Sequence, residues 1–308
     1  MPKKYKYNII LLVMLLILIV VFSNTSPFFL KLYNFKNILD QSTINIIVGI
    51  GMTFVICSAG IDLSVGSIAA FCGVIAAFFL HAGISVPLSM LAAILIGAFS
   101  GFINGYIISV IKVNPFIVTI ATMSIWRALT LIFTKSTPIY GFSSGFTMLG
   151  TGSFRLLPLT VVICIIVIVL GWILFNKTKL GYYSAAIGNN EEALRRTGVS
   201  NNYYKTIIYV LSGITAAIAG LIITSKLNCA DPTAGNMLEM DVIATVILGG
   251  TSINGGKGTI IGTVISGLFM SVLKNGLTIN AIPPYYQQLL VGLIIIFAVI
   301  TSDKFFKN

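Results

Sequence analysis

Ten apolar runs separated by short polar segments constrain this chain more than any other feature of its sequence. A helix of about 20 apolar residues crosses the hydrocarbon core of a bilayer and bonds its backbone groups internally. Hydrophobic residues make up 57% of the 308 positions and charged residues only 9%, which excludes an ordinary soluble domain. We therefore predict an all-α polytopic membrane protein, a single transmembrane domain over residues 1–308 with about ten spanning helices. The runs cover residues 9–22, 44–59, 63–80, 86–111, 115–133, 156–175, 207–224, 242–248, 259–273 and 285–301.

The positions of the basic residues predict which loops face the cytoplasm. An excess of Lys and Arg is typical of cytoplasmic loops. With the N-terminus inside and ten crossings, 12 of the 19 Lys and Arg residues fall in cytoplasmic segments, so we predict that both termini are cytoplasmic. We attribute the net charge of +11 to this topology and not to nucleic-acid binding, because no basic patch is interleaved with aromatic residues. The twelve residues are Lys3, Lys4, Lys6, Lys112, Lys177, Lys179, Arg195, Arg196, Lys205, Lys257, Lys304 and Lys307.

Two of the runs, residues 63–80 and 242–248, are shorter than the roughly 20 residues of a straight spanning helix. Asp62 precedes the first and Asp241 precedes the second. Short carboxylate side chains cap helix N-termini, so we interpret each aspartate as the N-cap of the helix that follows. Short or broken segments at matching positions of two halves are also typical of a transport site.

The landmarks around these two aspartates recur in the same order. Asn104 closes the span that follows the first short run, and Asn275 closes the span that follows the second. A proline opens the next span in each half. Because the offset between the two series is five spans, an odd number, we predict an inverted internal repeat. A rival alignment pairs residues 61–68 with residues 253–260 but offers no second landmark.

The longest polar insert, residues 176–205, contains a short helix with its own terminal signals. Asn189 is positioned as the N-cap, Glu192 as its capping-box partner, and Gly198 as the C-terminal stop. Acidic residues in the first turn and basic residues in the last complement the helix dipole. We predict a cytoplasmic docking helix within residues 186–200. Its candidate contact residues are Asn189, Asn190, Glu191, Glu192, Ala193, Leu194, Arg195, Arg196 and Gly198.

Polar residues inside the apolar runs are the candidates for a translocation route. A charge at the centre of a bilayer costs about 2.5–3.5 kcal/mol even on insertion scales, so Asp62, Asp241 and Arg127 need a structural or functional reason. Arg127 lies close enough to a polar loop for its side chain to reach the headgroups. The residues that we place near the route stand at the starts of spans in both halves: Asp62, Ser64, Asn114, Thr119 and Asp241.

Two glycine patterns have structural interpretations. Gly97, Gly101 and Gly105 follow one another at intervals of four residues, which lets two helix backbones approach closely in lipid. The loop at residues 249–258 is glycine-rich and contains Lys257, but it lacks the residue order of a phosphate-binding loop. We predict that it is a tight cytoplasmic turn between spans.

The sequence contains no constellation that favours catalysis. It has no paired carboxylate with a histidine, no nucleophile motif and no cysteine spacing for a metal, so we predict a transporter that is not an enzyme and holds no metal or cofactor. Three classes remain: a permease driven by separate ATPase subunits, an ion-coupled secondary transporter, and a channel. A secondary transporter would more often carry an intramembrane ionisable network, and a channel would not need a capped cytoplasmic helix. The docking helix therefore favours the ATPase-driven permease.

Four motifs in order resemble the ribose-type permeases of bacterial sugar ABC importers. They are GIDLSVGS at residues 60–67, NPFIVT at 114–119, AIGNNEEA with TGV at 186–199, and ILGG at 247–250. The resemblance extends over almost the whole chain. It implies a permease for a monosaccharide, a ribose-like pentose or a hexose, in the bacterial cytoplasmic (inner) membrane.

The same resemblance implies partners. They are a second permease copy or a paralogous permease, an ABC ATPase subunit that supplies two ATP-binding domains on the cytoplasmic face, and an extracytoplasmic sugar-binding protein. Residues 189–199 become the coupling helix that contacts the ATPase. Related permeases serve nucleosides and branched-chain amino acids, and these substrates remain alternatives.

Overall fold

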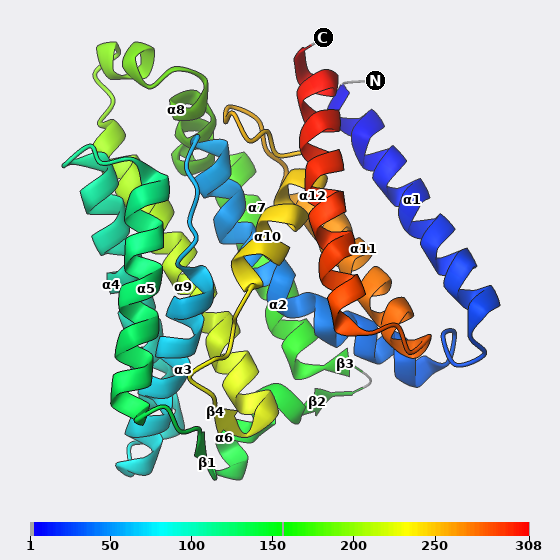
Figure 1. Ribbon diagram of the computed structural model, residues 1–308. Helices are drawn as coiled ribbons and strands as arrows, with labels where there is room; N and C mark the ends of the chain where they lie inside the picture. Colours follow the sequence, from blue (N-terminus) through cyan, green and yellow to red (C-terminus); the bar gives the residue numbers. More distant parts are fainter. Residues whose placement is uncertain (1–2, 156, 308) are drawn as a thin grey trace.

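The computed structural model describes residues 3–155 and 157–307, and most of them are helical (Figure 1). Each of the ten predicted runs lies largely in a helix, which confirms the all-α membrane fold. Two small antiparallel sheets pair β1 (Ile139–Tyr140) with β4 (Cys229–Ala230) and β2 (Ser153–Phe154) with β3 (Leu157–Pro158). The helices are α1 (Lys3–Thr25), α2 (Leu32–Cys57), α3 (Val65–His81), α4 (Val86–Ser109), α5 (Pro115–Thr134), α6 (Ser144–Thr151), α7 (Leu159–Lys177), α8 (Lys179–Arg196), α9 (Asn201–Leu227), α10 (Leu238–Leu248), α11 (Ile260–Ile279) and α12 (Pro284–Lys307).

Helix length separates the ten runs into two groups. Seven helices of the described residues, namely α1, α2, α4, α5, α7, α9 and α11, are long and apolar enough to cross a membrane. The two runs expected to be short are short: α3 has 17 residues and α10 has 11. Eleven residues span about 16 Å, roughly half the thickness of a hydrocarbon core. The tenth run lies in α12, and the side chains of its last part lie outside the described residues.

Burial distinguishes central helices from peripheral ones. Helices α2, α9 and α11 are mostly buried, because other helices pack around them. Helices α1, α4, α5 and α7 instead expose most of their apolar side chains, such as Val20, Leu95 and Ile132. In a membrane protein these exposed aliphatic faces contact lipid, so the core of the molecule consists of helices that have little lipid contact.

The glycine stripe of α4 packs against α9, as the sequence predicted. A Cβ added at Gly97 would lie 2.5 Å from the carbonyl oxygen of Gly213, and one added at Gly101 would lie 2.1 Å from that of Tyr209. At Gly105 the added atom would lie 2.7 Å from the Cα of Thr206. These distances leave no room for a side chain, so the stripe brings the two backbones together.

The helix contacts are reciprocal between the two halves of the chain. Helix α4 packs on α9, and α11 packs on α2; likewise α3 packs on α9, and α10 packs on α2. Within each half, α3 contacts α4 and α5, while α10 contacts α11 and α12. Each half therefore contributes helices to the core of the other.

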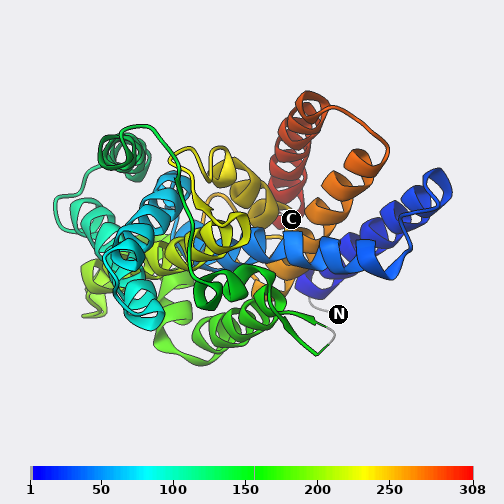
Figure 2. The same ribbon diagram turned by 90° about the horizontal axis from the view of Figure 1, so that it is seen from below.

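The segments predicted to be cytoplasmic gather at one end of the molecule. Figure 1 shows that α1 begins and α12 ends at the end that carries α8 and the loop at 249–258. In that loop, the backbone N–H of Gly256 donates to the carbonyl oxygen of Cys57 at the end of α2. Both sheets and α6 lie at the opposite end, where Figure 2 shows α1 and α12 on one flank and α4 and α5 on the other.

Candidate functional site

Two irregular segments meet near the middle of the molecule. Residues 58–64 run from the α8 end to the start of α3, and residues 231–237 run from the sheet end to the start of α10 (Figure 1). Backbone that is not helical is tolerated at membrane depth only where it is buried in protein or lines a cavity, because its polar groups need partners. The first turn of α3 meets the second segment at Gly66 and Gly235, where a Cβ on Gly66 would lie 2.2 Å from the carbonyl oxygen of Gly235.

Arg127 fixes the second segment. Its Nη1 atom donates to the carbonyl oxygens of Pro232 at 2.6 Å and of Ala234 at 2.9 Å. The expectation that Arg127 reaches toward the headgroups was therefore wrong. A guanidinium presents several donors in a rigid fork, so it satisfies two adjacent carbonyl groups that have no helix partner.

Asp62 is the centre of a buried polar cluster. Its Oδ1 accepts from the backbone N–H of Ser64 at 3.0 Å and from the Ser64 hydroxyl at 2.6 Å, and its Oδ2 accepts from the hydroxyl of Ser212 at 2.8 Å. The amide of Asn104 donates to the Ser64 hydroxyl at 2.8 Å. Asp62 is not the N-cap of α3, because the N-cap position belongs to Ser64. It instead joins the segment before α3 to α4 and α9.

Asp241 has a different environment from the one predicted. It lies in the first turn of α10, which begins at Leu238, so it does not occupy the N-cap position. Its Oδ2 forms an ion pair with the ammonium group of Lys274 in α11. Both side chains remain partly exposed, at 21% for Asp241 and 31% for Lys274. Pairing lowers the free-energy cost of placing either charge within the membrane domain.

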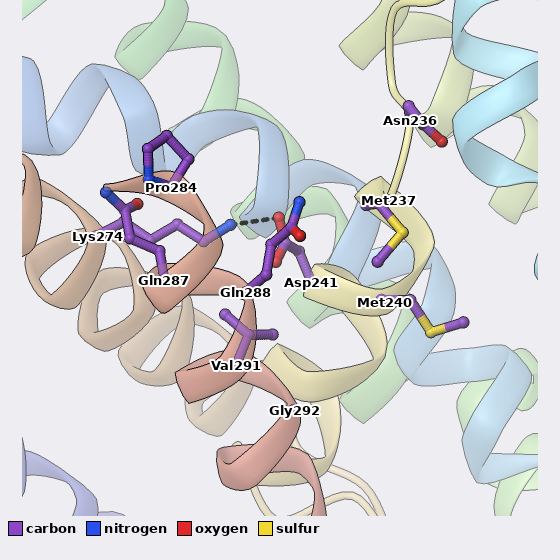
Figure 3. Close-up of a pocket in the computed structure, with 10 residues that line it drawn as sticks. All are labelled: Asn236, Met237, Met240, Asp241, Lys274, Pro284, Gln287, Gln288, Val291 and Gly292. Carbon is purple, nitrogen blue, oxygen red and sulfur yellow. Dashed lines mark hydrogen bonds and ion pairs between the residues drawn. The ribbon is translucent and has the colours of Figure 1, made fainter. Parts of the chain in front are cut away.

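The Asp241–Lys274 pair borders a cavity of about 510 Å³ between α10, α11 and α12 (Figure 3). This volume lies within the range of roughly 300–1,000 Å³ that is typical of small-molecule sites. Amide, charged and apolar side chains alternate around it. The lining residues are Asn236, Met237, Met240, Asp241, Lys274, Pro284, Gln287, Gln288, Val291 and Gly292.

The predicted docking helix is the end of α8. The backbone of Asn190 leaves the helical region, with φ −164° and ψ 99°, and the chain resumes a helix over residues 191–196. Asn190 caps this helix, since its Oδ1 accepts from the backbone N–H of Ala193 at 2.9 Å. The prediction of Asn189 as the N-cap was wrong by one residue. Gly198 has φ +83°, which confirms it as the C-terminal stop.

The acidic residues of this helix do not form a capping box. Glu192 pairs instead with Arg195 at 2.8 Å and with Arg196 at 3.2 Å, one turn further along. Its carboxylate therefore points toward the C-terminal end of the helix, and the predicted reach back to Asn189 does not occur. The two arginines and Glu192 form an exposed charged surface.

Glu191 connects the same helix to the rest of the protein. Its carboxylate accepts from Lys205 of α9 at 2.5 Å and from Lys112, in the loop after α4, at 3.2 Å. Partial burial opposes ionisation, but the two ammonium groups outweigh it and hold the pKa of Glu191 below its ordinary value. The amide of Asn201 also donates to the Glu191 carbonyl oxygen at 2.6 Å. These contacts connect the helix to α9 and to the loop after α4.

Comparison with known proteins adds the family. Residues 34–299 match the model of the family described as "Branched-chain amino acid transport system / permease component". The chain belongs to this family. No solved structure gives a significant match.

Three curated relatives cover nearly the full length of this permease-family chain. The ribose import permease protein RbsC of Bacillus subtilis (strain 168) is 41% identical over 292 residues, 94% of this chain and 91% of the relative. The D-allose transport system permease protein AlsC of Escherichia coli (strain K12) is 36% identical, over 92% and 88% of the two chains. The galactose/methyl galactoside import permease protein MglC of the same strain is 37% identical, over 93% and 91%.

The five residues predicted near the route fall into three places in this permease. Asp62, Ser64 and Thr119 converge, because the Thr119 hydroxyl lies 3.4 Å from the carbonyl oxygen of Ile61. All three side chains are fully buried. Asn114 is exposed and caps α5 by accepting from the N–H of Phe116. Asp241 borders the cavity, away from the other four.

Sequence reasoning missed several participants. Lys274 and Ser212 stand inside apolar helices, and no local motif connects either to its aspartate partner. The only signal for Lys274 was its charge within an apolar region, adjacent to the landmark Asn275. Gln287 and Gln288 of α12 could not be identified as cavity residues from the sequence, since glutamine is common near the end of a span.

Proposed function

We propose that this chain is the permease subunit of an ATP-driven importer and that it translocates a monosaccharide, a ribose-like pentose or a hexose. The observation that carries the proposal is the similarity, over more than nine tenths of the chain, to permeases named for the import or transport of ribose, allose and galactose. The pairing of a polar cavity with a capped helix outside the core supports the same function. A transporter of this kind needs a pathway for the solute and a surface that contacts the ATPase that drives it.

The proposed membrane arrangement has ten spans, two inverted repeats and both termini in the cytoplasm. Reciprocal packing supports the repeat, because α4 on α9 corresponds to α11 on α2 when α9 is taken as the counterpart of α2. Polar contacts follow the same correspondence: Ser109 of α4 bonds Thr206 of α9, and Asn275 of α11 bonds Asn34 of α2. The start of α3 and the start of α10 are approached from opposite ends, as inversion requires.

The helix at residues 191–196 is the proposed contact for the ATPase. Its outer surface presents Arg195, Arg196 and Ala193 to solvent at the end of the molecule that carries both termini. Asn189 precedes this helix, and Leu194 within it is half-buried. Glu191 connects the helix to the core. We therefore expect a displacement of this helix to be transmitted to α9 and, through Lys112, to the end of α4. A second permease copy or a paralogous permease, two ATP-binding domains and an extracytoplasmic binding protein complete the proposed importer.

The proposed translocation route runs past the starts of α3, α5, α10 and α12, in the cytoplasmic membrane of a bacterium. Asp62, Ser64 and Thr119 hold the broken helix ends in place, because their side chains are buried and bonded to protein. Asn114 fixes the start of α5. Asp241 borders the cavity between α10, α11 and α12.

Purification of the tagged chain from its host's membranes, followed by uptake in proteoliposomes, tests this function. The complex should contain an ATP-binding subunit and should take up labelled ribose, allose or galactose when ATP is enclosed on the ATPase side and the binding protein is outside. Proton and sodium ionophores should not abolish uptake. Because the family description names branched-chain amino acids, leucine and a nucleoside are the competing substrates. ATP-dependent uptake of either one without sugar uptake would overturn the proposal, as would uptake driven by an ion gradient alone.

A further inference from the structure

The Asp241–Lys274 ion pair lies within the membrane domain, where placing charged side chains costs free energy. α10 begins near the middle of the molecule, and Lys274 stands five residues before the end of α11, about 7.5 Å along the helix axis. Both side chains are partly exposed, and ion pairs with access to solvent contribute only about 0–1 kcal/mol, so this pair is weak evidence for stability. An ionisable residue within the membrane domain that borders a cavity is instead typical of a solute pathway.

The cavity beside this pair has the chemistry of a site for a neutral, hydroxyl-rich molecule. Among the described residues, the amides of Asn236 and Gln288 bond to no other side chain or backbone group. Gln287 donates to Thr278 and Ile282, which leaves its carbonyl oxygen as an acceptor. Figure 3 shows Gln288 reaching from α12 toward the ion pair. Amides both donate and accept, as the hydroxyl groups of a polyol do.

The electrostatics of the cavity favour an uncharged solute. Lys274 neutralises Asp241, and no other charged side chain lines the cavity within the described residues. A phosphate or a carboxylate would therefore lack a compensating charge. The ion pair still offers hydrogen bonds, because Lys274 contacts only Oδ2 of Asp241 and the ammonium group has further N–H donors. Met240 and Val291 supply apolar surface for the carbon–hydrogen faces of a ring.

We propose that this cavity is a solute subsite in which Asp241, Lys274, Gln287 and Gln288 bind an uncharged polyhydroxyl compound in transit. The inference rests on the proposed function and adds the residues that select the solute. Binding there is weak, because a site along a pathway must also release its solute. The occupant is the transported compound itself, not a lipid chain and not a helix of the second permease copy.

Filling the cavity tests the proposal in the intact importer complex. Gln288→Trp should lower sugar uptake at least tenfold while the complex still assembles and the binding protein still stimulates ATP hydrolysis. Gln288→Ala should raise the KM for uptake and leave the maximal rate closer to that of the wild type. Leu170→Trp, on the exposed apolar face of α7, is the matched control and should transport normally. Normal uptake by Gln288→Trp would overturn the subsite, whereas absence of sugar uptake in the wild type would overturn the proposed function.

Cysteine labelling gives a second measurement that does not depend on turnover. Gln288→Cys, in a variant whose native cysteines are replaced, should react with a membrane-impermeant methanethiosulfonate reagent in the detergent-solubilised complex. Millimolar ribose, allose or galactose should slow this reaction severalfold, and an equal concentration of ribose 5-phosphate should not. A cysteine that never reacts would show a cavity occupied by lipid or by the second copy, which contradicts the proposal. A reaction rate unaffected by every sugar would contradict it as well.

Discussion

Gly66 in the first turn of α3 and Gly235 of the segment before α10 lie backbone to backbone. A Cβ on Gly66 would lie 2.2 Å from the carbonyl oxygen of Gly235, and a Cβ on Gly235 would lie 2.6 Å from that of Gly66. Gly235 also has φ +68°, a conformation that favours glycine. The relative position of the two broken helices therefore depends on the absence of two side chains.

Gly66→Val is expected to destabilise the protein by about 1–3 kcal/mol, because the added atoms must displace rigid backbone. The Tm of the purified variant in detergent should fall, and its yield in the membrane should decrease. Gly145→Ala is the control, since its Cβ would meet only the side chain of Val86 at an ordinary 3.8 Å. A Gly66→Val protein as stable as Gly145→Ala would show that the contact between Gly66 and Gly235 is looser than described.

Asp62→Asn should retain most of the stability and uptake, whereas Asp62→Leu should lose both. An asparagine oxygen can still accept from Ser64, and its amide can donate to the Ser212 hydroxyl. Leucine leaves those donors without an acceptor inside the protein, which costs about 1–3 kcal/mol for each buried group. Thermal unfolding and uptake by the two variants provide the comparison. Equal behaviour of the two would exclude a hydrogen-bonding role for Asp62.

Single cysteines at positions 145 and 200 test the topology. Gly145 lies in α6 at the sheet end, and Ser200 lies between α8 and α9 at the opposite end. With the basic excess on the cytoplasmic side, an impermeant reagent applied to intact cells should label position 145 and should reach position 200 only after permeabilisation. Labelling of position 200 in intact cells would reverse the orientation.

Gly198→Val and Leu194→Asp should each reduce uptake at least tenfold without removing the protein from the membrane. Gly198 has φ +83°, and valine resists this conformation, so the helix at 191–196 would end in a different direction. Leu194 is the half-buried apolar residue of the same helix. Uptake and crosslinking to the ATPase measure the effect. If both variants transport normally, the helix is not the coupling element.

Glu191→Gln should lower stability at pH 7 by no more than about 1 kcal/mol, because the ion pairs are partly exposed. The pKa of Glu191 is lowered in the folded protein, so its ion pairs stabilise fully above the ordinary value of 4.5. That contribution is lost as the pH falls through the lowered pKa. The Tm difference between wild type and variant should therefore disappear at low pH. A difference that persists or grows there would assign the effect to something other than the carboxylate charge.

Most of the fold could be predicted from the sequence, because lipid imposes a strong requirement on helix length and polarity. All ten apolar runs, the two short helices and the packing role of the α4 glycines follow from this requirement. Local cap positions were less predictable. Asn189 and Asn190 are the same residue type, and only the backbone break at the second determines which one caps the helix.

The candidate site was only partly predictable, because its contacts join residues far apart in the chain. Asp62 and Asp241 were identified by their charge in an apolar context, but their partners Ser212 and Lys274 lie 150 and 33 residues away. The cavity itself depends on how α12 packs beside α10. No sequence pattern within a single helix determines how two helices that are distant in the chain pack together.

The packing of α4 against α9 has a consequence for biosynthesis. Helix α4 leaves the ribosome and enters the membrane well before α9 has been translated, so its glycine stripe first faces lipid or the insertion machinery. The same holds for α2, whose partners α10 and α11 are translated much later. A nascent chain stopped after α5 therefore lacks α9, α10 and α11, on which α2, α3 and α4 pack, and it should be a substrate for membrane proteases. Expression of the two halves as separate polypeptides should yield a stable protein only when both are synthesised together.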